Sequence, residues 1–312
     1  VIDPESNTLY VVAKIKDVSG ETVQYYERLF ALDIGTGAPK FGSPVDINPT
    51  YPGIGTGTDG NRRIVFDALY DFQRCGLVLA NGVVYVTFAS QGDIGPYHGW
   101  VVGFDAHTLR QVRVFNDTPN GSEGGIWMSG GAPAVDDQGN LFLATGNGTF
   151  DADVGGLNYG DSILKLTPAG TELKVADYFT PANQAALQAA DGDLGSGGVV
   201  LLPDSVGSAA HPHLLLLIGK DLTFYLVDRD QMGRFTSGGP DQTVQSLVTA
   251  GPSFSTPAYF DNTIYYFGLN DFPKAYHIDN ARIDPDPVSQ GPAPFGFPGA
   301  VPSVSANGLA NA

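Results

Sequence analysis

An all-β fold is predicted by three features of this sequence. An apolar run, a small turn and a second apolar run recur five times, and the second runs end at residues 33, 105, 167, 228 and 277. These ends are therefore 72, 62, 61 and 49 residues apart. The chain also contains 41 Gly and 22 Pro among 312 residues, which suits many tight turns. A period of this size, with several short strands per unit, is typical of a β-propeller made of four-stranded blades.

The five repeats define the expected blades in chain order. Because one four-stranded blade cannot bury both of its faces alone, we expect a single propeller domain over 1–312 rather than separate units. Both ends fall within blades, so we expect seven or eight blades when the propeller is complete and five to six in this chain. The expected blades begin at Val1 and then cover about 76–116, 125–180, 196–236 and 252–285.

The connections between these repeats give further expectations. In the first blade, the polar stretch Asp17 to Glu27 is expected to join the second and third strands. Residues 34–75 form a long Gly-rich connection, and loops of this length are uncommon unless they carry function or decorate a surface. In the Pro-rich tail, 302–308 resembles the first strand of a further blade.

Local signals predict one helix and one hairpin turn. Asn81-Gly82 between two apolar runs predicts a two-residue hairpin. The Ala-rich stretch from Asn183 to Ala190 predicts the only helix, with Thr180 as its cap and Pro181 in the first turn.

Charge and composition limit the possible partners. The chain has 33 acidic and 16 basic residues, a net charge of −17, so the phosphate backbone of a nucleic acid would be repelled. No run reaches the roughly 20 apolar residues that a membrane-spanning helix needs. Cys75 is the single cysteine, and beside Leu77-Val78-Leu79 it is expected to be a buried apolar residue.

Two segments of the third repeat carry the most informative residues. Gly124-Gly125-Ile126-Trp127 precedes Ala144-Thr145-Gly146-Asn147-Gly148 by about 20 residues. Over about 76–235 the chain resembles the quinoprotein dehydrogenases, propeller enzymes of the PQQ-like superfamily that use pyrroloquinoline quinone (PQQ). The resemblance implies that Trp127 forms the floor on which the flat quinone stacks, and that Asn147 supplies an oxygen to Ca²⁺.

Three further residues match positions of the same family. Asp193, in Asp191-Gly192-Asp193-Leu194-Gly195, corresponds to the proposed catalytic base. Lys220 corresponds to the basic residue that contacts a quinone oxygen. Asp93 stands where the family has a Glu ligand to calcium. The resemblance therefore implies a calcium site at Asp93 and Asn147, a cofactor site at Trp127 and Lys220, and a base at Asp193.

The residue types suit the implied chemistry. An aromatic face suits a planar quinone, and Ca²⁺ prefers carboxylate and amide oxygens. A carboxylate near the metal can accept an alcohol proton, while a Lys stabilises charge on the quinone oxygen. Each residue also has a simpler interpretation: Trp127 as packing between blades, Asn147 as a turn residue, Asp193 in a strand entry and Lys220 on the surface.

Departures from the family favour a protein without the cofactor. One cysteine cannot form the adjacent-cysteine pair that caps the quinone, and Asp93 is one methylene shorter than Glu. Propellers of the same superfamily that lack the cofactor, including the outer-membrane assembly scaffold, share the blade signatures. We therefore expect a secreted, extracellular or periplasmic bacterial propeller that binds protein or glycan without catalysis. The alternative is a PQQ- and calcium-dependent dehydrogenase acting on a small alcohol or sugar.

Overall fold

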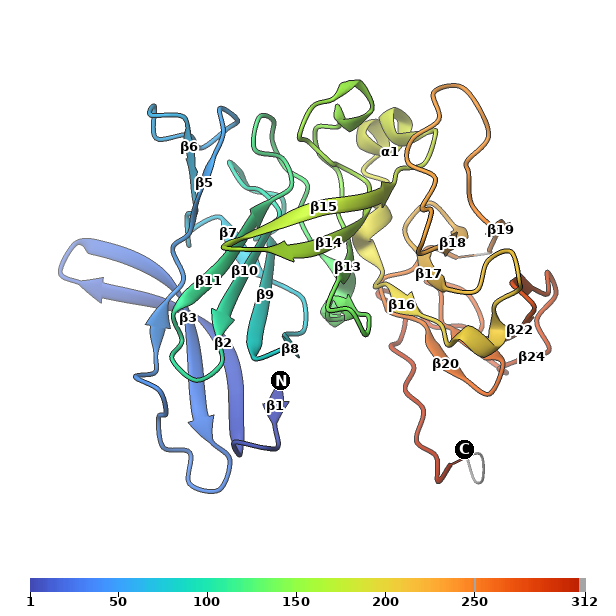
Figure 1. The fold of residues 1–312 in the computed structure, drawn as a ribbon, viewed down its shortest axis with the longest axis horizontal. Coiled ribbons are helices and arrows are strands. Elements are labelled where there is room, and N and C mark those ends of the chain that lie inside the picture. The colour runs from blue at the N-terminus through green and yellow to red at the C-terminus, as the bar shows by residue number, and fades with distance from the viewer. Residues whose placement is uncertain (250, 309–312) are drawn as a thin grey trace.

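Strands make up 41% of the chain and helices 6% in the computed structural model, which describes residues 1–249 and 251–308. This confirms the all-β prediction. The strands form sheets of four, nine, four and five strands, besides one two-stranded sheet, and these follow one another in chain order, from blue to red in Figure 1. The last four residues of the tail, 309–312, lie outside the described residues.

The five predicted repeats correspond to five blades. Blade 1 contains β1 (Ile2–Asp3), β2 (Thr8–Ser19), β3 (Thr22–Asp33) and β4 (Val45–Asp46). Blade 2 contains β7 (Asp71–Gln73), β8 (Val78–Ala80), β9 (Val83–Ser90), β10 (Trp100–Asp105) and β11 (Gln111–Asn116). Blade 3 contains β12 (Ala134–Val135), β13 (Leu141–Ala144), β14 (Ile163–Ala169) and β15 (Glu172–Phe179). Blade 4 contains β16 (Val200–Leu201), β17 (Leu214–Ile218), β18 (Thr223–Asp228) and β19 (Gln245–Val248). Blade 5 contains β20 (Ala258–Phe260), β21 (Thr263–Tyr266), β22 (Lys274–Asp279), β23 (Arg282–Ile283) and β24 (Ser289–Gln290).

Neighbouring strands within the blades pair antiparallel. A single parallel bridge between Val114 and Glu172 joins the fourth strands of blades 2 and 3, so these two blades form one curled nine-stranded sheet.

Each pair of neighbouring blades encloses its own hydrophobic core. Because successive side chains of a strand point to opposite faces, alternate residues of one strand belong to different cores. On β17, Leu214 and Leu216 pack against blade 5, while Leu215 and Leu217 pack against blade 3. The same alternation on β13 places Leu141 on the side of blade 2. The apolar runs of the repeats are thus continuous because both faces of an inner blade are buried.

The hairpin of blade 1 is longer than predicted. The polar stretch Asp17 to Glu27 was expected to be a loop, but β2 continues to Ser19 and β3 begins at Thr22. Backbone pairing runs as far as Ser19 opposite Thr22, so the ladder hydrogen bonds hold strands whose side chains are mostly polar. The hairpin projects from the blade at the left of Figure 1.

Two predicted local features are confirmed and one needs correction. Asn81 and Gly82 join β8 to β9 with φ values of 49° and 73°, as a two-residue hairpin turn requires. Helix α1 covers Gln184–Ala190, within the predicted range. Its cap position is Asn183 rather than Thr180, whose hydroxyl instead hydrogen-bonds Ser162 Oγ at 2.7 Å.

Two expected connections also differ in the structure. The long connection 34–75 contains a small hairpin, β5 (Thr50–Pro52) with β6 (Arg63–Val65). In the tail, 302–308 does not form the predicted strand: 302–306 have no regular secondary structure, Asn307 makes a single bridge and Gly308 lies in a turn. Val301 and Ser305 instead line a hollow beside Tyr265 of blade 5.

The remaining helical segments are four 3₁₀ turns: η1 (Met128–Gly130), η2 (Ala152–Val154), η3 (Leu194–Ser196) and η4 (Asp204–Val206). Within the described residues, no helix has the length and apolar character that crossing a bilayer demands. Cys75 is 2% exposed, as predicted, and burial raises the pKa of its thiol to about 12.

Removal of a core side chain should test the packing between blades. We expect Leu216→Ala to lower the free energy of unfolding by about 2–5 kcal/mol, because Leu216 is fully buried between blades 4 and 5. Urea denaturation would measure the change. Val248→Ala is the control: Val248 is 75% exposed, so its loss should change stability by at most about 0.5 kcal/mol. Equal effects of the two substitutions would contradict the assigned interface.

Candidate functional site

A cluster of polar side chains lies where loops of blades 3 and 4 meet. Asn147 follows β13 of blade 3, and Lys220 follows β17 of blade 4. Asp191 ends helix α1 in the left-handed region, with φ of 53°, and Asp193 immediately precedes η3. The segment between these two acidic residues turns back sharply, so that both face the same lysine.

Asp193 is the centre of this cluster. Its Oδ1 accepts a hydrogen bond from the backbone N–H of Asn147 at 2.7 Å, and its Oδ2 accepts one from Lys220 Nζ at 2.6 Å. The side chains of Lys220 and Asp193 are only 22% and 9% exposed. Both carboxylate oxygens of Asp193 are therefore engaged by neighbouring loops.

The lysine is engaged as completely as the carboxylate. Besides Asp193, Lys220 Nζ contacts the carbonyl oxygen and Oδ2 of Asp191, each at 3.1 Å. An ammonium group has three hydrogens, so these three contacts use its full capacity. Its backbone N–H also donates to the carbonyl oxygen of Asp193 at 3.1 Å, which fixes the strand end against the loop.

Asn147 contributes differently from its neighbours. Its Nδ2 donates to Asp191 Oδ1 at 3.0 Å, while its Oδ1 is buried and has no hydrogen-bond partner among the described residues. A buried carbonyl oxygen without a partner is costly and calls for a specific explanation. This oxygen is the one unused acceptor of the Asn147 side chain.

Trp127 lies beside Asp193, with Gly146 between them. A Cβ on Gly146 would overlap Asp193 Oδ1 and would lie 2.8 Å from Trp127 Cδ1, so only glycine fits there. The Trp127 ring is met edge-on by Tyr97 at 6.2 Å between centroids. The guanidinium of Arg74 lies over the same indole, 5.5 Å from its centroid.

Asp93 lies at the edge of this group. It is exposed, its φ is 58°, and its Oδ1 is 3.5 Å from the hydroxyl of Tyr97. Within the described part of the chain, no hydrogen bond joins Asp93 to Asn147 or Asp193. The structure thus brings Asn147, Asp193 and Lys220 into direct contact, places Trp127 next to them, and connects Asp93 only through Tyr97.

Burial and charge oppose each other at the ion pair. Burial raises the pKa of the Asp193 carboxyl, and the hydrogen bonds from Lys220 and Asn147 offset this only in part. Burial acts to lower the pKa of Lys220, but the two carboxylates outweigh it, so that this pKa is raised. The protonated lysine is the form that the cluster stabilises.

A second acid near the cluster was missed by the sequence reasoning. Asp161 is fully buried behind Asp193, where its Oδ1 accepts a hydrogen bond from the backbone N–H of Leu194 at 3.2 Å. Burial raises its pKa to about 7. The only signal in the sequence was an acidic residue two positions before the apolar strand Ile163–Ala169, which is too common a pattern to indicate this role.

As arranged, these donors do not fit the family's calcium and quinone site. Lys220 and Asp193 satisfy each other, and Arg74 lies over the ring on which a quinone would stack. Among residues 1–249 and 251–308, no three His, Cys, Asp or Glu side chains are grouped as metal ligands. The unpartnered oxygen of Asn147 is the one feature that suits a bound cation. The roles implied for Asp93, Trp127, Asn147, Asp193 and Lys220 stay predictions.

Comparisons with known proteins concern the fold. No protein-family model and no curated protein sequence matches the chain. Solved structures with a similar fold include quinohemoprotein alcohol dehydrogenase ADHIIG from Pseudomonas putida HK5, with 15% identity, TM-score 0.48 and coverage of 87% of this chain and 42% of that one. A europium-containing methanol dehydrogenase has 11% identity, TM-score 0.46 and coverage of 86% and 67%. BamB from Moraxella catarrhalis has 12% identity, TM-score 0.44 and coverage of 91% and 59%.

The three structures are similar to this chain in fold alone. The chain spans less than half of the first structure's length. With TM-scores below 0.5 and identities of at most 15%, these similarities carry no argument about activity or partners.

Removal of the positive charge of Lys220 should destabilise the polar cluster around Asp193. In Lys220→Met the aliphatic stem is retained, but the carboxylates of Asp191 and Asp193 are left facing each other. We expect the free energy of unfolding to fall by about 3–5 kcal/mol, the usual cost of breaking a buried pair. Chemical denaturation would measure it, with Lys174→Met on the exposed side of β15 as the control. A loss no larger than that of the control would show that the pair does not hold the loops.

The raised pKa of Asp161 should make stability depend on pH. Between its ordinary pKa of 3.8 and the folded value of about 7, the unfolded chain is ionised while the folded chain keeps the proton. The free energy of unfolding should therefore fall as the pH rises through this window. The difference between the two pKa values corresponds to about 4 kcal/mol in total. In Asp161→Asn the Tm should decline less between about pH 4 and 7, and part of the slope should remain because the pKa of Glu27 is also about 7. Parallel Tm curves for wild type and variant would contradict this assignment.

Proposed function

We propose that this chain is a non-catalytic PQQ-like propeller, located outside the cytoplasm, that binds a protein or a glycan. One observation carries the proposal: each carboxylate oxygen of Asp193 already accepts a hydrogen bond, and the ammonium of Lys220 has three oxygen contacts. A general base needs a lone pair that the substrate can reach, and a group that stabilises a quinone oxygen needs a free N–H. The Asp193 side chain is only 9% exposed, and the three contacts of Lys220 use all of its N–H groups. A structural ion pair that joins two blades accounts for this geometry without a reaction.

The pair has a direct structural use. Asn147 belongs to the loop after the second strand of blade 3, and Lys220 begins the turn after the second strand of blade 4. Contacts through Asp193 tie these loops together at 2.7 and 2.6 Å. A rigid rim of this kind suits a binding propeller, since loops held in one conformation lose less entropy when a partner binds.

The alternative is a PQQ- and calcium-dependent alcohol or sugar dehydrogenase. The adjacency of Trp127, Asn147 and Asp193 favours it, as does the unpartnered Oδ1 of Asn147. In that case Asp93 and Asn147 would hold the calcium, and Lys220 would have to leave Asp193 for the quinone. Such a change would have to break the ion pair at 2.6 Å.

A ligand-binding measurement separates the two functions. We expect PQQ with millimolar Ca²⁺ to leave the Tm unchanged and to produce no dye reduction with ethanol or glucose. A ligand at 100 times its Kd would add about 2.7 kcal/mol of stability, enough to move the Tm by several degrees. A clear rise in Tm that is lost in Trp127→Ala, or alcohol-dependent dye reduction, would overturn the non-catalytic proposal and support the dehydrogenase.

A further inference from the structure

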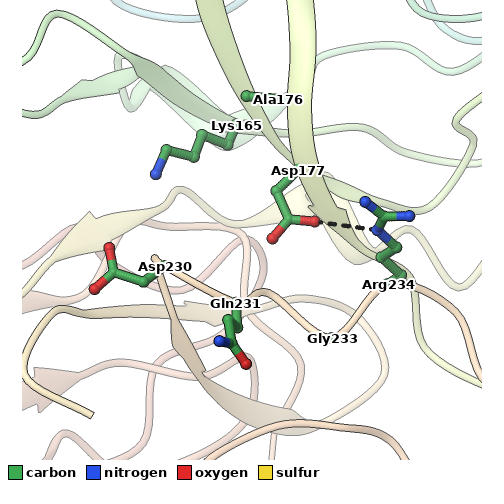
Figure 2. Close-up of a pocket in the computed structure, with 7 residues that line it drawn as sticks. All are labelled: Lys165, Ala176, Asp177, Asp230, Gln231, Gly233 and Arg234. Atoms are coloured by element: carbon green, nitrogen blue, oxygen red, sulfur yellow. Dashed lines mark ion pairs between the residues drawn. The ribbon is translucent and has the colours of Figure 1, made fainter.

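A polar groove lies away from the Asp193 cluster, between the outer strands of blade 3 and the loop that follows β18. Three hollows of about 480, 650 and 600 Å³ adjoin one another there, and Asp230 lines all three. Each volume falls within the range of small-molecule sites, roughly 300–1,000 Å³. Figure 2 shows the first hollow, where Lys165, Asp177, Asp230, Gln231 and Arg234 surround one opening.

The backbone irregularity beside this groove occurs in two blades, but the pair of residues next to it differs between them. Lys165 on β14 stands opposite Asp177 on β15, and the register shifts beside this pair because Ala176 is an extra, bulged residue. Blade 2 has the same shift, where the corresponding pair is Gly103 and Arg113. A bulge re-aims side chains next to functional sites. In blade 3 both residues beside the bulge are charged, and both line the groove.

The groove is held rigidly by contacts to its rear. Asp177 Oδ2 accepts a hydrogen bond from the backbone N–H of Met232 at 2.9 Å. Lys165 Nζ donates to the carbonyl oxygen of Arg229 at 2.9 Å, which connects blade 3 to blade 4. These hydrogen bonds hold the base of the groove in place. Other polar atoms of the lining remain available at its opening.

The two arginines of the groove are only loosely paired. Arg234 Nε lies 3.5 Å from Asp177 Oδ1, and the Arg234 side chain is 70% exposed (Figure 2). Arg229 Nη2 is 3.5 Å from Asp204, and its Nε is buried with no partner among the described residues. His213 bridges Asp230 at 2.7 Å and Asp204 at 3.6 Å. Donors and acceptors for a ligand are therefore available along the groove.

The mixture of charges selects the class of ligand. In the first hollow Lys165 and Arg234 balance Asp177 and Asp230, so this part of the groove favours neither a cationic nor an anionic chain. The two adjoining hollows add further carboxylates, which disfavour an anionic chain. Carboxylate, guanidinium and amide groups are planar and can make paired hydrogen bonds, and an imidazole offers a donor or acceptor at each ring nitrogen. Neighbouring hydroxyls of a sugar both donate and accept, so they match such an alternating surface. The groove also extends over several adjoining hollows, which suits a chain of sugars rather than one.

We propose that this groove binds a neutral oligosaccharide. The inference rests on the proposed binding function and names its ligand class and its location. Arg234 and Asp230 would bind hydroxyls near the opening, and the guanidinium of Arg229 would bind a hydroxyl in the second hollow. Tyr259 also lines that hollow, where an aromatic ring can pack on the apolar face of a sugar.

Titration calorimetry with cellohexaose, chitohexaose and laminarihexaose would test this inference. At least one of these should bind with a Kd of about 1 mM or tighter, and Asp230→Asn and Arg234→Gln should each weaken binding about tenfold, the loss of one charged hydrogen bond. Both residues are exposed, so the variants should fold. The matched controls are Asp153→Asn and Arg110→Gln, exposed changes elsewhere that should leave binding unaltered.

Three results would overturn the inference. They are no binding of any of the three hexasaccharides, binding that both groove variants leave unchanged, or tighter binding of a heptalysine or polygalacturonate than of the neutral sugars. None of these results depends on PQQ. If no sugar binds and the Tm is unchanged in PQQ and Ca²⁺, the oligosaccharide site is wrong but the non-catalytic propeller stands. Alcohol-dependent dye reduction, in contrast, would by itself contradict the non-catalytic propeller.

Discussion

Burial of both faces of the inner blades is the constraint on which the rest of this structure depends. A strand such as β17 must present apolar side chains in both directions, to blade 3 through Leu215 and to blade 5 through Leu216. Such strands leave little room for chemistry, so polar groups gather in the connections and on the outermost strands. The Asp193 cluster and the groove around Asp230 both follow this rule, and both involve blades 3 and 4.

The two polar features differ in how they satisfy their charges. In the cluster the acid, the base and the backbone donors are matched, which compensates for their removal from water. In the groove the charged pairs are more exposed, and the two arginine pairs are longer, as with Arg234 and Asp177 at 3.5 Å. Matched buried groups stabilise a loop arrangement, whereas loosely paired exposed groups remain free to bind a ligand. The same residue types therefore serve different purposes according to burial.

The periodicity of apolar runs was enough to predict the blades, because alternation and turn residues act locally. Asn81-Gly82 and helix α1 were predicted for the same reason. The extension of β2 and β3 was not, since a two-stranded ladder of polar residues has no apolar pattern. Asp161 was missed because its burial depends on Leu194, which is distant in sequence. The proximity of Asn147, Asp193 and Lys220 was predicted through the family resemblance. The hydrogen bonds and the ion pair that these residues make with one another depend on side-chain directions, which the spacing of residues in the sequence does not determine.

The projecting hairpin of blade 1 has a consequence for solubility. Its outer part pairs only with itself, and Val18 and Val23 at its end are 59% and 46% exposed. Unpaired strand edges with apolar residues can add strands from other molecules and begin aggregation. Lys16, Asp17 and Glu21 place charges of both signs at this end of the hairpin, where they would be forced beside one another in a stacked sheet. Charged residues at the end of an exposed strand pair oppose such growth, so the polar composition of this hairpin is compatible with its projection from the blade.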